Sequence, residues 1–240
     1  MKVARILGVP FQTKGRQDTI TELTSRVQQE ERTHVVTANP EIVMAANENP
    51  DLASIFDQAY IVPDGIGIVY AAKWTNLPIY ERVTGIELLE GLMEQANQHG
   101  WRVYLFGAGP EINQLAAENL AKRYPKAQIV GRRDGYFGPA DEIGIAQEIA
   151  AARPHLLFVA LGAPKQDMWI AKYWDQLQVP LAMGVGGSFD VISGKVKRAP
   201  VIWQKLHLEW LYRLLKQPSR WKRQLSIPRF IVSVWLDRRK

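Results

Sequence analysis

Polar side chains that could carry out acid–base chemistry follow two apolar segments in the first third of the chain. Thr37 and Asn39 come after the apolar run 34–36, and Asp64 follows the apolar run 59–62. Short runs of this kind are typical of buried parallel strands. Because ligands of an open α/β sheet gather beyond the carboxyl ends of its strands, we expect these three side chains to share one site.

Two of these residues also have a purely structural interpretation. Asn39 precedes Pro40, and asparagine is a preferred helix N-cap while proline suits the first helical turn. Asp64 precedes Gly65, a combination that is common in turns. The sequence alone therefore leaves local capping and ligand binding open as alternatives.

One glycine-containing loop follows the apolar run 101–106. Gly107 and Gly109 stand before a helical pattern, and bare glycines let backbone N–H groups approach an anion at a helix N-terminus. Position 112 is isoleucine, so the third glycine of the dinucleotide-binding fingerprint is missing. The loop predicts either an anion site or a close-packed strand–helix junction.

A second glycine-rich loop is more specific. Gly184, Gly186 and Gly187 expose backbone after an apolar run and ahead of Asp190, and such a loop can wrap a nucleotide. It lacks the lysine–serine pattern of a P-loop, which argues against ATP hydrolysis. Asp190 either contacts a nucleotide hydroxyl or base edge or caps the next turn. Tyr136 either stacks on a base or belongs to a solvated turn.

Several classes of chemistry are excluded or disfavoured. The 240-residue chain has no cysteine, which rules out disulfides, thiolate nucleophiles and cysteine-ligated zinc. No group of His, Asp and Glu has metal-ligand spacing, and no Asp-x-Asp pair occurs. A Gly-x-Ser-x-Gly nucleophile elbow is also absent. We expect neither a metal nor a cofactor.

The order of elements predicts an open, mostly parallel α/β sheet with helices on both faces, a Rossmann-like fold, over residues 1–195. Strand-like and helical patterns alternate along this part of the chain and are joined by short loops rich in glycine and proline. Strands are expected at 3–9, 34–38, 59–62, 101–106, 128–130, 156–161 and 181–183.

The charge of the chain is concentrated in its last segment. Residues 1–194 carry 17 Lys/Arg and 22 Asp/Glu, whereas residues 195–240 carry 13 and 2. Apolar residues recur three and four apart over 199–217, and tryptophan beside lysine and arginine suits an anionic membrane surface. We assign 196–240 as a basic amphipathic appendage, with packing of its apolar face on the core as the alternative. No signal peptide or membrane span is predicted, so we expect a cytoplasmic, peripheral address.

Taken together, these motifs resemble the WecG/TagA/CpsF family of glycosyltransferases. The matching segments are 37–41, 63–67, 104–109, 135–137, 161–166 and 184–190. They occur in the family's order and cover most of residues 30–200, which makes the set far more specific than any single motif.

The resemblance implies a transferase that moves N-acetylmannosamine or a related sugar from a UDP donor onto N-acetylglucosamine linked to undecaprenyl diphosphate. It implies inversion at the anomeric carbon without a metal, in the synthesis of teichoic acid or another surface polysaccharide. Asp64 would be the general base, Thr37 and Asn39 would position the substrate, and Gln166 would add a polar contact.

The remaining expectations concern the UDP-sugar and the tail. Tyr136 and the loops at 107–109 and 184–190 would bind the donor. Arg213, Arg220 and Arg223 of the tail would approach a diphosphate as the tail closes over the site at the inner face of the plasma membrane. Self-association is left open.

Two rival interpretations use parts of the same sequence. A nicotinamide oxidoreductase would use Gly107 and Gly109, but its third glycine is missing. A nucleic-acid-binding protein would use the basic tail, yet residues 1–194 are acidic overall, and we expect no nucleic-acid partner.

Overall fold

The computed structural model describes residues 3–197, 199–200, 203, 209, 211–212 and 225–238. Most of the helix expected over 199–217 therefore lies outside the described residues.

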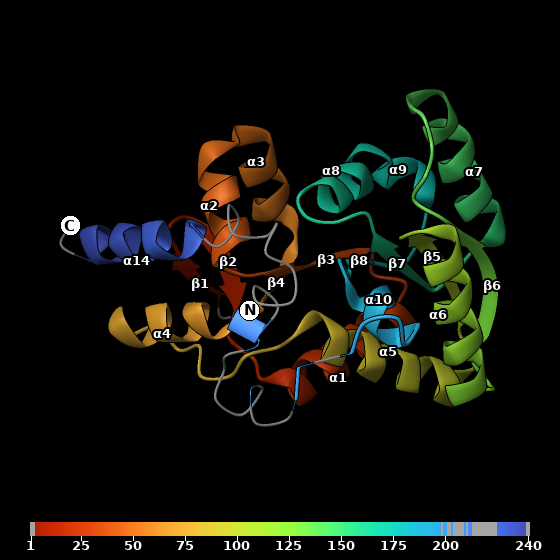
Figure 1. The fold of residues 1–240 in the computed structure, drawn as a ribbon, viewed down its shortest axis with the longest axis horizontal. Helices are drawn as coiled ribbons and strands as arrows, with labels where there is room; N and C mark the ends of the chain where they lie inside the picture. The colour runs from red at the N-terminus through yellow and green to blue at the C-terminus, as the bar shows by residue number, and fades with distance from the viewer. Residues whose placement is uncertain are drawn as a thin grey trace.

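An eight-stranded sheet runs through the molecule in the order β1-β2-β4-β3-β8-β7-β5-β6 (Figure 1). The strands are β1 (Val3–Ile6), β2 (Val9–Gln12), β3 (Thr33–Ala38), β4 (Tyr60–Pro63), β5 (Arg102–Gly107), β6 (Gln128–Arg133), β7 (Leu156–Ala160) and β8 (Leu181–Gly184). All neighbouring pairs are parallel except β1 and β2. The expected open, mostly parallel α/β sheet is confirmed.

The beginning of the chain differs from the expectation. One strand was expected over residues 3–9, whereas residues 3–12 form a hairpin of β1 and β2 with Ile6 paired to Val9. Leu7 and Gly8 make the turn with φ of 47° and 84°, the left-handed values that a two-residue hairpin loop requires. Leucine seldom adopts such a φ, so the sequence gives little sign of this turn, and the prediction of a single strand is wrong.

Helices cover both faces of the sheet (Figure 1). One face carries α1 (Arg16–Gln28), α5 (Gly85–His99), α6 (Pro110–Arg123) and α10 (Ser188–Ile192). The other carries α2 (Pro40–Glu48), α3 (Pro50–Gln58), α7 (Glu142–Ala152), α8 (Lys165–Lys172) and α9 (Trp174–Leu177), with a short 3-10 turn at Pro139–Asp141. Beside β1, α4 (Ile66–Trp74) contacts the last helix, α14 (Ser226–Asp237).

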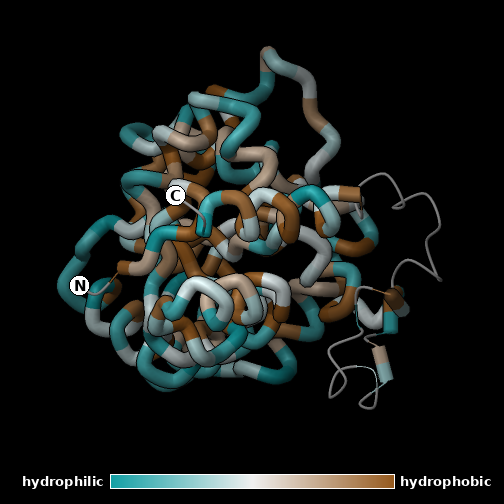
Figure 2. Tube along the Cα trace, turned by 90° about the vertical axis from the view of Figure 1, so that its left-hand side faces the viewer, coloured by the Kyte–Doolittle hydropathy of each residue, from teal (hydrophilic) through white to brown (hydrophobic). Residues whose placement is uncertain are grey.

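Alternation along each central strand explains the two layers. Val35 of β3 is buried among residues of α1 and α5, whereas Val36 is buried among residues of α2 and α3, as the two-residue period of a strand requires. Hydrophobic residues accordingly gather inside the fold, while many outer turns are hydrophilic (Figure 2). The buried strands thus hold the helices on both faces in fixed positions.

The last helix packs on the body of the protein through one face. Phe230 and Val234 are buried in the same cluster as residues of α2 and α4. Ile231, Val232 and Trp235 are 42%, 55% and 49% exposed. The helix therefore has a core-facing side and an apolar outer side. The division at residue 195 stays a prediction, and any deletion of the tail also removes core contacts.

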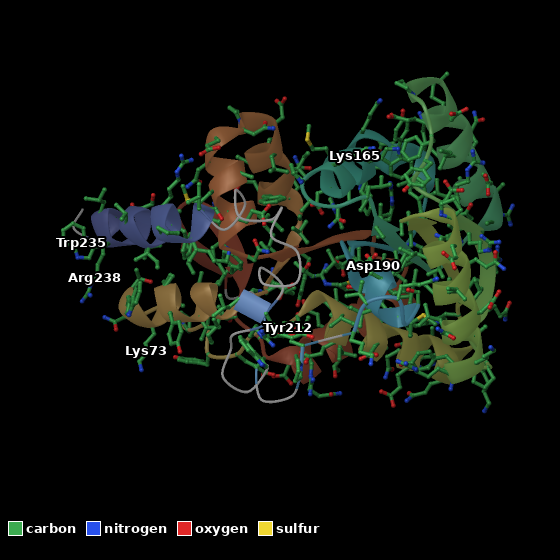
Figure 3. All side chains as sticks on the ribbon, in the orientation of Figure 1. Lys73, Lys165, Asp190, Tyr212, Trp235 and Arg238 are labelled. Atoms are coloured by element: carbon green, nitrogen blue, oxygen red, sulfur yellow. The ribbon has the colours of Figure 1, made fainter. Side chains whose placement is uncertain are left out.

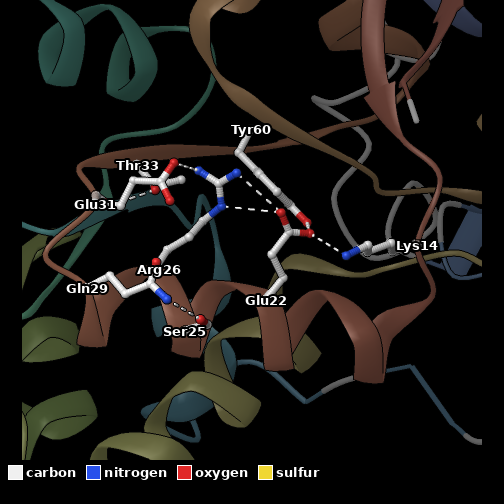
Figure 4. A network of polar contacts seen from close by, with 8 residues as sticks. All are labelled: Lys14, Glu22, Ser25, Arg26, Gln29, Glu31, Thr33 and Tyr60. Atoms are coloured by element: carbon white, nitrogen blue, oxygen red, sulfur yellow. Dashed lines mark hydrogen bonds and ion pairs between the residues drawn. The ribbon is translucent and has the colours of Figure 1, made fainter. Parts of the chain in front are cut away.

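A polar network anchors the start of β4 (Figure 4). The Tyr60 hydroxyl donates to Glu22 Oε2 at 2.8 Å, and Lys14 and Arg26 form ion pairs with the same carboxylate at 3.0 and 3.3 Å. Burial by itself would raise the pKa of Glu22, but the hydrogen bonds from Lys14 and Tyr60 lower it below its ordinary value. The network ties α1 to the strand that leads to Asp64.

We predict that Glu22→Gln destabilises the protein by about 1 kcal/mol near neutral pH, because the charged partners lose their carboxylate. The folded state lowers the pKa of Glu22 below 4.5, so the unfolded chain takes up this proton first as the pH falls. The free energy of unfolding of the wild type should therefore decrease on acidification below about 4.5 more steeply than that of the variant. Denaturant unfolding as a function of pH measures this, with the exposed Glu118→Gln as control. Parallel curves for wild type and Glu22→Gln would contradict the assignment.

Candidate active site

The sheet order brings the predicted site residues to one edge. Thr37 lies near the carboxyl end of β3, Asp64 follows β4, and Gly184 ends β8. Because β4 and β8 both flank β3, these ends are separated by one or two strand spacings of about 5 Å. The neighbouring strands β3 and β8 are followed by helices on opposite faces, α2 and α10, the arrangement at which open α/β sheets bind ligands.

Asp64 and Thr37 meet at the N-terminus of α5. The Asp64 backbone N–H donates to the carbonyl oxygen of Ala38 at 2.9 Å, and its Oδ2 accepts from the Gly85 N–H at 3.3 Å. A Cβ on Gly85 would lie 3.2 Å from Thr37 Oγ1 and 3.7 Å from Asp64 Oδ2. The partial positive charge of the helix N-terminus stabilises the carboxylate, and the Thr37 hydroxyl lies against the same helix end.

Asn39 lies beside the same segment but has a defined structural task. Its Oδ1 accepts from the Ile42 N–H at 3.1 Å and caps α2, so the capping interpretation is confirmed. Gly65 has a φ of 119°, and a Cβ there would lie 3.5 Å from the Asn39 Cβ. The side chain therefore stands next to the turn that follows Asp64, and its proposed contact with substrate stays a prediction.

Gln166 holds the second glycine loop. It is only 4% exposed, and its Oε1 accepts from the Gly186 N–H at 3.0 Å. A Cβ on Gly184 would lie 2.4 Å from Gln166 Nε2 and 2.7 Å from Asp167 Oδ1, so a larger residue at this position would have to displace these buried side chains. The side chain expected as a polar contact to substrate fixes the loop at the end of β8.

Asp190 lies in the first turn of α10 (Figure 3). A Cβ on Gly187 would lie 3.5 Å from Asp190 Oδ2, which places the half-buried carboxylate against the loop it was predicted to serve. This position is compatible with both interpretations of Asp190, the nucleotide contact and the cap.

The two glycines of the first glycine loop, Gly107 and Gly109, have different surroundings. Gly107 has a φ of 107°, and a Cβ there would lie 2.5 Å from backbone atoms of Ala160, which supports the close-packed junction at this glycine. Gly109 precedes α6, and a Cβ on it would lie 3.8 Å from the Tyr136 hydroxyl. Tyr136 is 77% exposed. An accessible ring therefore lies beside a helix N-terminus, where a nucleotide base or phosphate could reach it.

Two buried polar residues near these loops were missed. Asn113 Nδ2 donates to the carbonyl oxygens of Gly107 and Arg133 at 2.9 and 3.0 Å and so joins the carboxyl ends of β5 and β6. Asp167 is fully buried, with its Oδ1 3.7 Å from His34 Nε2. In the sequence, Asn113 could have been found as a polar residue on the otherwise apolar face of a predicted helix. Asp167 gives no such sequence signal, because its burial depends on the packing of α8 over the sheet.

The remaining expectations concern the arginines of the tail, a metal site and a membrane span. Arg213, Arg220 and Arg223 lie outside the described residues. Among the residues that the structure does describe, no three His, Asp or Glu side chains are grouped as metal ligands. In the same described part of the chain, every helix is too short or too polar to cross a bilayer.

An α/β sheet with a carboxylate and two glycine loops at its carboxyl edge is typical of enzymes that bind nucleotides or nucleotide derivatives. Residues 4–240 match the model of the glycosyl transferase WecG/TagA/CpsF family. The chain belongs to this family and is a glycosyltransferase. This result favours the glycosyltransferase interpretation of the sequence over the two rivals, a nicotinamide oxidoreductase and a nucleic-acid-binding protein.

Curated relatives match over most of their own length. A Bacillus spizizenii protein is 41% identical over 223 residues, 89% of this chain and 86% of its own. A Bacillus subtilis protein is 39% identical, covering 83% and 78%, and a Staphylococcus aureus protein is 38% identical, covering 86% and 81%. Each is named N-acetylglucosaminyldiphosphoundecaprenol N-acetyl-beta-D-mannosaminyltransferase.

We predict that Gly184→Ala destabilises the protein by about 1–3 kcal/mol, because the new methyl group overlaps Gln166 and Asp167 in a packed interior. Denaturant unfolding measures the change. Gly144→Ala is the matched control, since nothing lies within 4 Å of a Cβ there and alanine in an exposed helical position should be neutral or stabilising. Equal stability of Gly184→Ala and wild type would show that the loop tolerates displacement of Gln166.

Proposed function

We propose that this enzyme transfers N-acetylmannosamine from UDP-N-acetylmannosamine to the N-acetylglucosamine of an undecaprenyl-diphosphate-linked acceptor. The relatives' shared name supports the acceptor and the transferred sugar. The observation that carries the proposal is the Asp64 carboxylate beside Thr37 at the α5 N-terminus. A sugar hydroxyl is a poor nucleophile, and a carboxylate within reach can remove its proton as the new bond forms.

The proposed reaction is a single displacement. The acceptor hydroxyl oxygen attacks the anomeric carbon, its proton passes to Asp64, and the bond from that carbon to the β-phosphate oxygen breaks. UDP leaves as an anion. The relatives' names specify a β-linked product, which requires inversion when the donor sugar is α-linked to UDP.

Backbone groups and cations, without a bound metal, stabilise the leaving diphosphate in this proposal. The Val185 and Gly186 N–H groups already donate to the carbonyl oxygen of Val159 and to Gln166 Oε1, whereas the N-terminus of α6 at Gly109 lies at the same sheet edge as Asp64. Fixed donors of this kind stabilise developing negative charge because they do not have to reorganise during the reaction. The exposed ring of Tyr136 would stack on the uracil, and Asp190 would contact the nucleotide.

The acceptor is anchored in a membrane, and the protein offers a surface that suits one. Trp74 of α4 and Val232 and Trp235 of α14 are 43%, 55% and 49% exposed and line one groove. Lys73 and Arg238 extend at the same end of the molecule (Figure 3). Tryptophan with lysine and arginine favours the headgroup region of anionic membranes, so we propose that this end contacts the inner face of the plasma membrane.

We predict that Asp64→Asn lowers the transfer rate roughly 10²- to 10⁴-fold, because the amide cannot accept the proton. Donor affinity should change little, since the Gly85 N–H still has an oxygen acceptor. Steady-state kinetics and donor binding measure the two effects. Asp175→Asn, at a side chain that is 98% exposed, is the matched control, and normal turnover of Asp64→Asn would remove Asp64 as the base.

The identity of the donor sugar and the need for a metal are tested by incubating the full chain with a short-chain lipid diphosphate acceptor and a panel of UDP-sugars. We expect turnover with UDP-N-acetylmannosamine and an unchanged rate after addition of EDTA. A preference for UDP-glucose or a mannosaminuronic acid donor would contradict the proposed sugar. Loss of activity in EDTA with recovery on adding Mn²⁺ or Mg²⁺ would contradict the metal-independent reaction.

A further inference from the structure

One ion pair joins the tail to the loop that supports Asp64. Arg82 Nη1 lies 2.9 Å from Glu209 Oε2, and the two side chains are only 18% and 12% exposed. Glu209 and Asp237 are the two acidic residues among the 46 residues 195–240. A carboxylate in this strongly basic segment is thus placed against an arginine of the body.

The segment that begins at Arg82 contacts the backbone and side chain around Asp64. The Val83 N–H donates to the carbonyl oxygen of Pro63 at 2.8 Å, one residue before Asp64. Gly85 N–H then donates to Asp64 Oδ2 at 3.3 Å. Arg82 is therefore one residue from the backbone contact with Pro63 and three residues from the contact with the Asp64 carboxylate.

The same loop is held at a second point. Glu81 Oε2 accepts from the Arg16 N–H at 3.2 Å and so ties the loop to the start of α1. Glu81 and Arg82 are consecutive, and their side chains bind partners from α1 and from the tail. The hydrogen bond from Arg16 holds Glu81, and the ion pair with Glu209 holds the side chain of the next residue, Arg82.

Burial makes this pair different from an ordinary surface contact. Removing one partner of a largely buried pair leaves the other charge in a poorly solvated position, so the remaining side chain and its loop move to reach water. A second tail-to-body pair, Arg229 with Glu48 at 4.0 Å, has side chains that are 70% and 67% exposed. Such a surface pair contributes little.

We propose that Glu209 is a positioning residue for glycosyl transfer, which holds Arg82 and thereby fixes the 82–85 segment and the orientation of the Asp64 carboxylate. The expected effect of Glu209 on the transfer rate rests on the proposed function. Its structural part, restraint of residues 82–85 by the tail, does not depend on the identity of the substrates.

The test compares Glu209→Gln with the matched control Asp237→Asn, which removes the other acid of the tail at an exposed position. We expect Glu209→Gln to lower kcat about 10- to 100-fold, because small misplacements of a catalytic group have effects of this size. The KM for the UDP-sugar should stay within about twofold in this account, since the residue acts through Asp64. Asp237→Asn should match wild type in both constants.

Hydrogen exchange of a peptide spanning residues 82–85 gives a readout that needs no substrate. We expect faster exchange in Glu209→Gln than in wild type and Asp237→Asn, with thermal unfolding confirming that each variant is folded. In addition, the Arg82→Gln/Glu209→Gln double variant should lose no more kcat than Arg82→Gln alone, because the two residues act as one unit.

Unchanged exchange in a folded Glu209→Gln variant, or additive kinetic losses in the double variant, would overturn the inference. A rise in KM at constant kcat would also overturn it, because Glu209 would then serve donor binding. Failure of the wild type to use any UDP-sugar would instead count against the proposed function, while the exchange data would still decide whether the tail restrains the loop.

Discussion

The parallel pairing of β3 with both β4 and β8 is the constraint on which the rest of the site depends. Ala38 lies opposite Pro63 on one side of β3, and Val35 lies opposite Met183 on the other. This register places Thr37 beside the residue that follows β4 and near the loop that follows β8. A slip of one residue would turn Thr37 to the opposite face of the sheet and away from Gly85, so the site is only as well defined as this pairing.

The environment of Asp64 is provided by residues from several other parts of the chain. The N-terminus of α5 supplies a backbone donor at Gly85 and the partial charge of the helix. The preceding loop is tied to α1 by Glu81 and to the tail by Arg82. In the proposed reaction Asp64 must keep one orientation toward the acceptor hydroxyl, and contacts from separate parts of the fold hold the segments around it.

The last helix of the tail, α14, packs on the body through one side and exposes apolar side chains on the other. Phe230 and Val234 of α14 belong to the hydrophobic core, while Val232 and Trp235 face outward at the end of the molecule that also carries Trp74. One helix can thus stabilise the body and offer a surface for a membrane. The same arrangement means that loss of activity on deleting 196–240 would combine lost core packing with any lost contact at the site.

Local signals in the sequence determined much of the fold. Asn39 with Pro40 predicted the start of α2, because a helix cap involves neighbouring residues only. The ordered motifs also determined the family. Tertiary structure alone decided that Gln166 is buried against Gly186, that Gly107 serves close packing with Ala160, and that Glu209 meets Arg82. Those contacts join residues far apart in the chain, and their partners are set by strand order and helix packing, which a local pattern does not contain.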